Sequence, residues 1–448
     1  MKSAKQMNSF GAVCVVVGSI IGSGIFAAPS IVAQFSPSLF ITAAIWIVGT
    51  IMCLCGGQIY GRLAQHFPHS GGQYVFIRES FNPSIAAVYG WISFLVMCPL
   101  MIAGSSLFFG EQLRFLAPNI STFEIKMIGL FLALLFTFLN HRGIELAGRF
   151  QSVLVVLLVA VLFLVTASSY AKLMPSEIPV SHDSFRSGSL TQGLWALAIV
   201  LWTFEGFNAA TFLTGEIKNG AQRSIKIVFL ALAIVIISYF AFINAVHRYI
   251  PYENLIHSPN VGTTLASLSL GSYGGLVVFI LTCLTIASAL HTSIMIGPRI
   301  TSRLALDGLC WERLSRTHAR YRSPSFALWS QMALVSVFLL AGSFEMLISF
   351  FIIVNWLFYG ITAMGYHNLA RNRNIHHSFW DKISILLFLS GVWTLLTFQV
   401  VSQPRLTAAG LAFVSALYGI LRYLSGKQVI KGLSKGEISE PKTAAHLI

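Results

Sequence analysis

Apolar runs of about twenty residues recur along almost the whole chain, separated by short segments that carry most of the polar side chains. A helix that crosses a bilayer needs about 20 predominantly apolar residues. The pattern therefore predicts an all-α integral membrane protein with twelve transmembrane helices, in one domain over 9–425 between tails at 1–8 and 426–448. The predicted spans are roughly 9–35, 39–61, 84–110, 125–141, 150–171, 190–214, 225–246, 274–298, 325–343, 346–369, 383–402 and 407–425.

Composition agrees with the membrane class. Of the 448 residues, 56% are hydrophobic and only 10% are charged, whereas a soluble domain has about 25% charged residues. The first apolar run is too long and too interrupted by glycine for a secretory signal peptide, and many further spans follow it. The six cysteines lie mostly in apolar runs without the paired spacing of metal ligands, so no metal and no other cofactor is expected.

Charge gives the predicted orientation. If the N-terminus is cytoplasmic, most of the 29 lysines and arginines fall in cytoplasmic segments. The exceptions are Arg114, Lys126, Lys172, Arg186, Arg248 and Arg405. This positive-inside bias predicts two cytoplasmic termini in a plasma membrane, the inner membrane of a bacterium. The net charge of +14 is then a consequence of topology, and a nucleic-acid partner is not needed to explain it.

The first span contains the segment GSIIGSGIF at 18–26, in which Gly18, Gly22, Ser23 and Gly24 crowd together. Glycine in a helix interior costs about 1 kcal/mol relative to alanine. Unpaired backbone at membrane depth is tolerated only where it is buried in protein or lines a cavity. The segment therefore either lines a site or lets a neighbouring helix pack closely, as small residues do in membranes.

The sixth span contains a second interruption, in LWTFEGFNAATFLTGEIKN at 201–219, where Gly206 lies between Glu205 and Asn208. Interrupted spans at corresponding positions of two halves point to the substrate site of a transporter. We therefore expect a five-plus-five inverted repeat, with halves at roughly 9–171 and 190–369, discontinuous helices 1 and 6, and two further helices in 383–425. Freed amides suit a carboxylate and freed carbonyls suit an ammonium group, so the two breaks together suit an amino acid.

Five segments carry a family resemblance. They are GSIIGSGIF, PHSGGQYVFIRESF at 68–81, GRFQSVL at 148–154, WTFEGFNAA, and PRITSRLALDGLCWERLSRTHARYRSPSFAL at 298–328. In this order they resemble the amino acid–polyamine–organocation transporters, and within them the bacterial amino acid antiporters and permeases. The resemblance covers roughly residues 9–425 and implies a transporter that is not an enzyme.

The resemblance also implies roles for individual residues. The substrate carboxylate would meet the hydroxyl and amides around Ser23 and Gly24, beside Gly22. The ammonium group would meet main-chain carbonyls near Ile20, Trp202 and Glu205. Trp202 matches an aromatic residue that covers the substrate in this family; packing in the core or against lipid is the alternative.

Two departures from the family pattern concern coupling and specificity. Many of its permeases carry a lysine on helix 5 in place of a sodium ion, but the matching position falls near Leu158 and helix 5 has no lysine. The amine and arginine exchangers also lack this lysine. They often have a glutamate on helix 6 where this chain has Asn208, whereas Glu205 occupies a normally apolar position.

Two ionisable residues at membrane depth are candidates for coupling. A charged group there costs about 2.5–3.5 kcal/mol on insertion scales, so a function is the default hypothesis for Glu205. His291 in the eighth span titrates near neutrality and suits proton transfer. A neutral glutamate bonded between helices and a structural histidine are the alternatives. Pro99 in the third span predicts a kink without chemistry.

The sequence thus predicts a secondary active transporter for amino acids, with cationic amino acids and amines among the candidate substrates, working by alternating access and exchange. The alternative is a proton-coupled amino acid uptake symporter. A membrane enzyme is disfavoured because no clustered catalytic or metal-binding motif occurs in a span, and a channel because no repeated filter is visible. The expected partners are the small-molecule substrate, the lipid bilayer and, in the alternative, a proton; a homodimer is left open.

Overall fold

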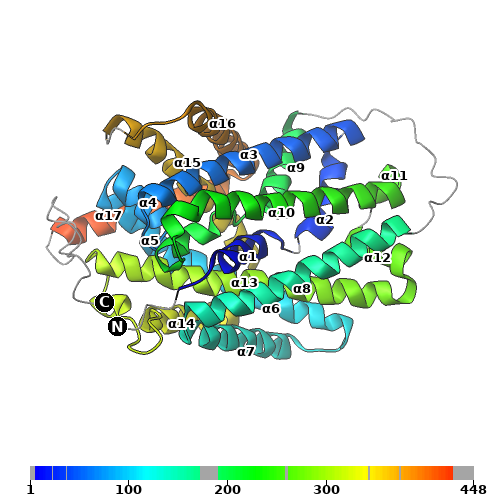
Figure 1. The fold of residues 1–448 in the computed structure, drawn as a ribbon, viewed down its shortest axis with the longest axis horizontal. Helices are drawn as coiled ribbons and strands as arrows, with labels where there is room; N and C mark the ends of the chain where they lie inside the picture. Colours follow the sequence, from blue (N-terminus) through cyan, green and yellow to red (C-terminus); the bar gives the residue numbers. More distant parts are fainter. Residues whose placement is uncertain are drawn as a thin grey trace.

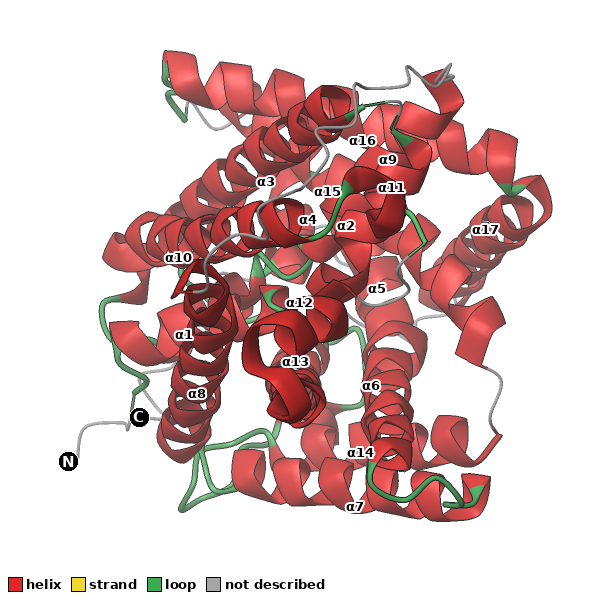
Figure 2. Cartoon of the chain, turned by 90° about the vertical axis from the view of Figure 1, so that its right-hand side faces the viewer, coloured by secondary structure: helices red, strands yellow, loops and turns green. Residues whose placement is uncertain are grey.

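The computed structural model describes residues 6–22, 24–36, 38–171, 190–257, 261–341, 344–372 and 375–426. Over these residues the chain is helical and contains no strand (Figure 2). The α-helices are α1 (Ser9–Ile20), α2 (Gly24–Phe35), α3 (Leu39–His66), α4 (Gln73–Ser80), α5 (Pro83–Ile92), α6 (Cys98–Gln112), α7 (Thr122–His141), α8 (Ile144–Ala171), α9 (Leu190–Thr203), α10 (Gly220–Tyr249), α11 (Tyr252–Leu255), α12 (Val261–Leu270), α13 (Gly274–Leu306), α14 (Ser325–Ala341), α15 (Phe344–Asn372), α16 (Phe379–Ser402) and α17 (Pro404–Gly426). The shorter elements are a π-helical turn, η1 (Ser93–Met97), and the 3-10 helices η2 (Leu113–Phe115), η3 (Ala209–Glu216), η4 (Gly271–Tyr273) and η5 (Glu312–Ser315).

Several helices begin at residues that cap them. Ser121 and Glu124 form a capping box at the start of α7: the Ser121 hydroxyl accepts a hydrogen bond from the Glu124 amide, and the Glu124 carboxylate accepts one from the Ser121 amide. Ser378 and Asp381 form the same motif at the start of α16. The Asn82 side chain accepts the Ile85 amide at the start of α5. Such caps satisfy amides that have no partner within the helix.

The helices are long and apolar enough for a multi-pass membrane protein. Among the described residues, seven helical segments pass this test, and the bent pair α1 and α2 raises the number to eight. The seven are Leu39–His66, Pro83–Phe115, Thr122–His141, Ile144–Tyr170, Gly220–Tyr249, Val261–Leu306 and Phe379–Ser402. The predicted all-α membrane class is thereby confirmed, whereas the count of twelve spans and the inverted repeat stay predictions.

Each predicted span overlaps a helix or a pair of helices, but the boundaries differ. Helix α3 continues beyond the predicted end at 61, and α13 continues beyond 298. The short helices α4 and α12 were not predicted, because neither is long enough to give a span signal. The predicted N-terminal tail lies outside the described residues up to position 5, and the C-terminal tail lies outside them after position 426.

Helix α1 lies in the middle of the bundle, packed against α8, α10 and α13 (Figure 1). Gly18 permits this packing. A Cβ atom at this position would lie 2.1 Å from the Ser288 hydroxyl oxygen and 2.3 Å from the Gln151 amide nitrogen. Small residues let membrane helices approach closely in this way, so the central place of the first broken helix depends on its glycine.

The α-helical structure of the third predicted span is interrupted next to Pro99, where the sequence predicts a kink. Pro99 lies in the first turn of α6, directly after the π-turn η1. Proline lacks the N–H that would bond the carbonyl four residues earlier, and its ring clashes with that carbonyl. A π-turn ahead of Pro99 accommodates both effects, and such turns are frequent at functional sites.

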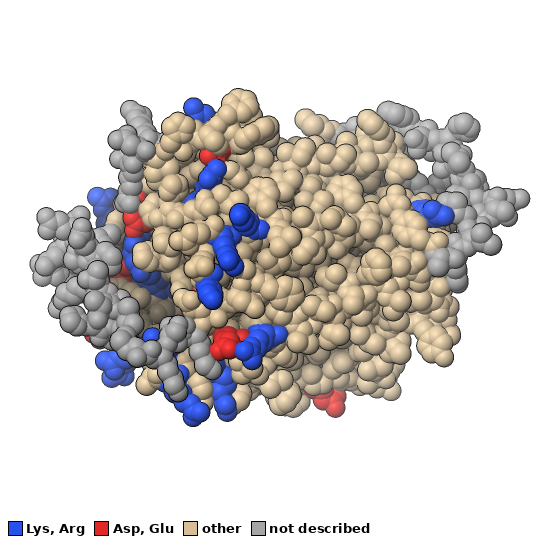
Figure 3. Space-filling model, viewed as in Figure 1, with Lys and Arg blue, Asp and Glu red and all other residues tan. Residues whose placement is uncertain are grey.

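Charged side chains gather at one end of the molecule in the face that Figure 3 shows, and they are sparse over the middle of that face. We call this the charged end. Arg62, Arg78, Arg299 and Arg303 belong to helix segments that end or begin there, at the termini of α3, α4 and α13. An apolar belt beside a charged end is the distribution expected of a protein in a bilayer.

Candidate functional site

The first helix is broken where the glycine cluster predicts. Helix α1 ends at Ile20, α2 begins at Gly24, and the two are bent by 43°. The Gly22 amide folds back to the Ile20 carbonyl at 2.7 Å. The first amides of α2 have no carbonyl of their own helix to bond, so they form a donor site of partial positive charge. Ser23, the predicted hydroxyl ligand, lies outside the described residues.

The second break lies beside the first. Helix α9 ends at Thr203, a turn follows, and η3 begins at Ala209. Gly206 in this turn has φ of 103°, a conformation that residues with a Cβ rarely adopt. A Cβ there would lie 2.3 Å from the Ser19 hydroxyl oxygen and 3.0 Å from the Ser19 carbonyl carbon. Glycine is therefore required at position 206 for two reasons: the positive φ, and the close approach of this turn to the end of α1.

A tyrosine from a third helix joins the two breaks. The Tyr239 hydroxyl of α10 lies 3.0 Å from the Ile20 carbonyl oxygen and 2.9 Å from the Thr203 carbonyl oxygen. Tyr239 is fully buried. The last carbonyls of α1 and α9 thus converge on one hydroxyl group, which carries a single proton.

The breaks open onto a cavity of about 250 Å³. Binding sites for drug-sized ligands occupy about 300–1,000 Å³, so this volume suits a smaller molecule. Six of the seven predicted substrate residues line the cavity. They are Ile20, Gly22, Gly24, Trp202, Glu205 and Asn208. The remaining walls come from α4, α5, η1, α6, η3, α10, α13 and α15.

Glu205 is held by two neutral donors of α15. The Asn355 side-chain amide donates to Glu205 Oε1 at 3.0 Å, and the Tyr359 hydroxyl donates to the same oxygen. In the described part of the chain, no lysine, arginine or histidine makes an ion pair with Glu205. Sequence reasoning missed both donors, although an asparagine and a tyrosine in an apolar span were a visible signal. The Glu205 carboxylate therefore lines the cavity with its Oε1 atom already hydrogen-bonded to α15.

Trp202 lies over the start of α2. A Cβ atom at Gly24 would be 3.2 Å from Trp202 Cζ3, so the indole ring packs on that backbone. The side chain is 49% exposed. Its other side lines an apolar cavity of about 300 Å³ that also includes Trp195 and Trp356. Trp202 is thus a wall between the polar breaks and an apolar space, a position that fits the predicted cover.

Asn208 and His291 occupy different environments. Asn208 is 4% exposed and lines the cavity, and its carbonyl accepts the Thr211 amide and hydroxyl. His291 does not line the cavity. Its Nδ1 lies 2.9 Å from Gln151 Oε1, and the Gln151 amide donates to Ser288 Oγ at 2.8 Å. The two predicted coupling residues are therefore not neighbours in one site.

The environment of His291 is closed. Its ring is fully buried and meets the edges of Phe136 and Phe150. Leu158, the position that matches the family's helix 5 lysine, is also fully buried. His291 thus belongs to the packing between α8 and α13.

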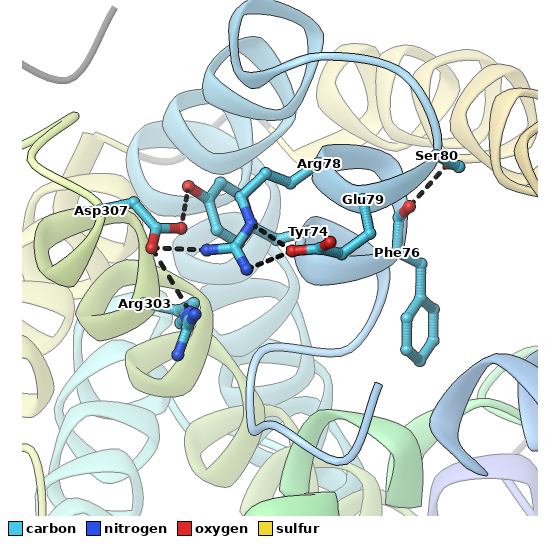
Figure 4. A network of polar contacts seen from close by, with 7 residues as sticks. All are labelled: Tyr74, Phe76, Arg78, Glu79, Ser80, Arg303 and Asp307. Atoms are coloured by element: carbon cyan, nitrogen blue, oxygen red, sulfur yellow. Dashed lines mark hydrogen bonds and ion pairs between the residues drawn. The ribbon is translucent and has the colours of Figure 1, made fainter. Parts of the chain in front are cut away.

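A polar network fixes the wall of the cavity toward the charged end (Figure 4). Gln73 lines the cavity at the start of α4. The next residue, Tyr74, donates its hydroxyl to Asp307 at 2.8 Å, and Arg78 pairs with Asp307 at 2.5 Å and also with Glu79. Burial and the Asp307 carboxylate raise the pKa of Tyr74 well above its usual value. These bonds tie α4 to the end of α13.

Two broken helices that meet at a cavity inside an apolar helix bundle define the class of secondary transporters. The chain belongs to the amino acid permease family, whose model, described as "Amino acid permease", matches residues 7–421. This confirms the family predicted from the motifs.

Curated relatives extend over nearly the whole chain. The cystine/glutamate transporter of Homo sapiens is 27% identical over 418 residues, which cover 92% of this chain and 83% of that protein. The b(0,+)-type amino acid transporter 1 of Rattus norvegicus is 25% identical over 427 residues, 94% of this chain and 86% of that protein. The Asc-type amino acid transporter 1 of Homo sapiens is 25% identical over 430 residues, 92% of this chain and 80% of that protein. These relatives are transporters and not enzymes.

Proposed function

We propose that this protein is a secondary active transporter that exchanges amino acids across a membrane by alternating access. The observation that carries the proposal is the convergence of both helix breaks on one cavity. The substrate carboxylate would be bound by the free amides at the start of α2, beside Ser23 and Gly24. Its ammonium group would be bound by the carbonyls near Ile20, Trp202 and Glu205.

The proposed topology has twelve spans, a five-plus-five inverted repeat and two cytoplasmic termini in a bacterial inner membrane. The overlap of helices with all predicted spans supports it. The charged end supports the orientation, because positive residues remain on the cytoplasmic side. Rocking of one half against the other would expose the cavity to each side in turn.

Exchange is favoured by the absence of a lysine on helix 5, which is α8 in the structure. Because Leu158 occupies the position of that lysine, no positive charge at this position replaces a bound sodium ion when the carrier is empty. The return of the empty carrier is then expected to be slow, and internal substrate would accelerate uptake. The relatives include a transporter named for two amino acids, cystine and glutamate.

The alternative is proton-coupled uptake. Glu205 favours it, because this carboxyl group lies in the cavity and is bonded to neutral donors only, so a proton can bind without breaking an ion pair. The same bonds bear on specificity. A cationic substrate side chain would compete with Asn355 and Tyr359 for the carboxylate.

Uptake of radiolabelled amino acids into proteoliposomes tests the proposal. We expect vesicles loaded with amino acid to take up label faster than empty vesicles. Equal uptake by both, with accumulation driven by a proton gradient, would instead support the symporter. Absence of amino acid uptake under all of these conditions would refute both.

A glycine variant ties the transport to the first break. Gly24→Leu places a side chain against Trp202 and over the α2 amides, so we expect a folded protein without amino acid uptake. Gly193→Leu in α9 is the matched control, because a Cβ at Gly193 meets no atom within 4 Å. Wild-type uptake by Gly24→Leu would remove the break from the mechanism.

A further inference from the structure

A second large concavity, separate from the substrate cavity, lies on the outer surface. It is a groove of about 850 Å³ between η1, η5 and α14. Its floor includes Phe94 and Leu95 of η1. One side is formed by α14, where Phe326 is 48% exposed and Val337 is 64% exposed. Apolar side chains that are this exposed mark a surface that contacts lipid or another protein.

The groove has the length of one bilayer leaflet. Phe326 and Val337 both line it and mark its extent along α14. At 1.5 Å per residue they are roughly 16 Å apart. The hydrocarbon core of a bilayer is about 30 Å thick, so one leaflet is about 15 Å. An acyl chain fits this length, whereas the small substrate proposed above does not need it.

One end of the groove is polar and positively charged. Arg313 and Arg316 line it together with Glu312. The Arg316–Glu312 contact is long, at 3.8 Å, and both side chains are largely exposed. No ion pair of Arg313 occurs among the described residues. Two arginines against one glutamate leave a net positive charge for an anionic group.

An aromatic residue at the same end marks the depth of the membrane interface. Trp311 lines the groove, is 63% exposed and meets Trp91 edge to face at 5.7 Å. The Trp91 indole donates to the Leu309 carbonyl at 3.1 Å, which fixes this aromatic pair. Tryptophan is enriched at the headgroup level of membranes. The arginines therefore lie at headgroup level and the apolar part of the groove at acyl-chain level.

We propose that this groove is a binding site for an anionic phospholipid. Its phosphate is bound by Arg313 and Arg316, and one acyl chain lies along α14 from Phe326 to Val337. Basic side chains at a membrane surface attract anionic headgroups in this manner.

The site is in contact with the wall of the substrate cavity. Ser93 and Met97, the first and last residues of η1, line the cavity, whereas Phe94 and Leu95 between them line the groove. One π-turn is thus the shared wall of both spaces. A bound acyl chain supports this turn from outside, so anionic lipid is expected to accelerate exchange as well as to bind.

The binding test uses phosphatidylglycerol in phosphatidylcholine. The double variant Arg313→Gln/Arg316→Gln removes the proposed headgroup contacts, and Ala333→Phe fills the groove at an exposed position. A basic side chain near an anionic surface contributes about a fivefold factor, so the double variant should bind phosphatidylglycerol roughly 25-fold more weakly. Lipid retained by the purified full-length protein, measured by mass spectrometry, gives this readout without any transport.

Matched controls separate the groove from general surface effects. Arg149→Gln/Arg320→Gln removes the same charge at exposed positions outside the groove, and Ala160→Phe adds the same ring to the exposed face of α8. Both should retain clearly more phosphatidylglycerol than the matching groove variants. Equal retention by the groove variants and these controls overturns the proposal. So does an Ala333→Phe protein that loses a dimer and keeps its lipid, because a second copy then covers the groove.

Transport provides the second test. Exchange by the wild type should rise when phosphatidylglycerol is added to phosphatidylcholine vesicles, and the groove variants should lose this rise while keeping exchange in phosphatidylcholine alone. A rise that persists in both groove variants overturns the link through η1. If the wild type exchanges no amino acid in any lipid, the proposed function fails, while the retention measurement still decides on the lipid site.

Discussion

We expect Gly206→Ala to separate the two helix breaks and to weaken substrate binding in a protein that still folds. The added Cβ would lie 2.8 Å from Ser19 Cβ and 3.0 Å from the Ser19 carbonyl carbon. Carbon atoms prefer about 3.5–4.0 Å, so the turn must move by about 0.5 Å or more. The Ser19 hydroxyl can rotate away, but the backbone carbon cannot.

A shift of this size reaches or exceeds the roughly 0.5 Å of misplacement that a preorganised site tolerates. A hydrogen bond to a charged group contributes about 1.5–3 kcal/mol. Loss of one such bond to the substrate would weaken binding by roughly 10- to 150-fold. The positive φ of Gly206 adds backbone strain of about 1–3 kcal/mol for any residue with a Cβ, which lowers stability and not specifically affinity.

Gly271→Ala is the control that isolates the contact. Gly271 also has a positive φ, of 62°, but a Cβ there meets no atom within 4 Å. Thermal unfolding in detergent should show a loss of stability for both variants, larger for Gly206→Ala because it adds the Ser19 contact, whereas only Gly206→Ala should lose amino acid affinity in binding and exchange assays. Wild-type affinity of Gly206→Ala, or an equal loss in Gly271→Ala, would refute the reasoning from the Ser19 contact.

Three further changes probe the same cavity. Glu205→Gln should keep exchange of neutral amino acids and lose that of cationic ones; full exchange of both with a lost pH dependence would identify proton coupling instead. Trp202→Ala should raise the KM for exchange more than Trp202→Phe does, because a flat apolar cover is lost, and equal kinetics of Ala and wild type would contradict this. Tyr239→Phe removes the donor to both break carbonyls and should lower the free energy of unfolding by about 1–3 kcal/mol; an unchanged midpoint of thermal unfolding would argue against that bond.

The sequence predicted the two breaks because their cause is local. Glycines at 18–24 and at 206 destabilise the helices in which they lie. This effect can be predicted from the segment itself, without knowing which helices pack against it. The interruption of apolar periodicity by Glu205 and Asn208 is local as well. This is why six of the predicted residues could be assigned to one cavity before any packing was known.

The partners that complete the site could not be predicted in the same way. Asn355 and Tyr359 reach Glu205 across 150 and 154 positions of sequence, and Tyr239 reaches Ile20 across 219. A hydropathy pattern gives the position of a span along the chain but not the face that it turns toward each neighbour. For the same reason the depth of His291 made it a candidate, although its ring faces Gln151 and two phenylalanines.

If the proposed function holds, the position of Tyr239 explains why the cavity binds an ammonium group. Its hydroxyl faces the carbonyls of Ile20 and Thr203, yet it can donate to only one of them at a time. The Ile20 carbonyl also accepts the Gly22 amide, so the Thr203 carbonyl is the acceptor that loses its donor when the hydroxyl turns to Ile20. A buried carbonyl without a donor costs about 1–3 kcal/mol. A substrate ammonium group carries three donors and can satisfy the remaining acceptor without displacing the tyrosine. The substrate thus supplies a hydrogen-bond donor that the two helix breaks lack, and this bond contributes to binding. Amino acids are therefore favoured over carboxylic acids that have no amine.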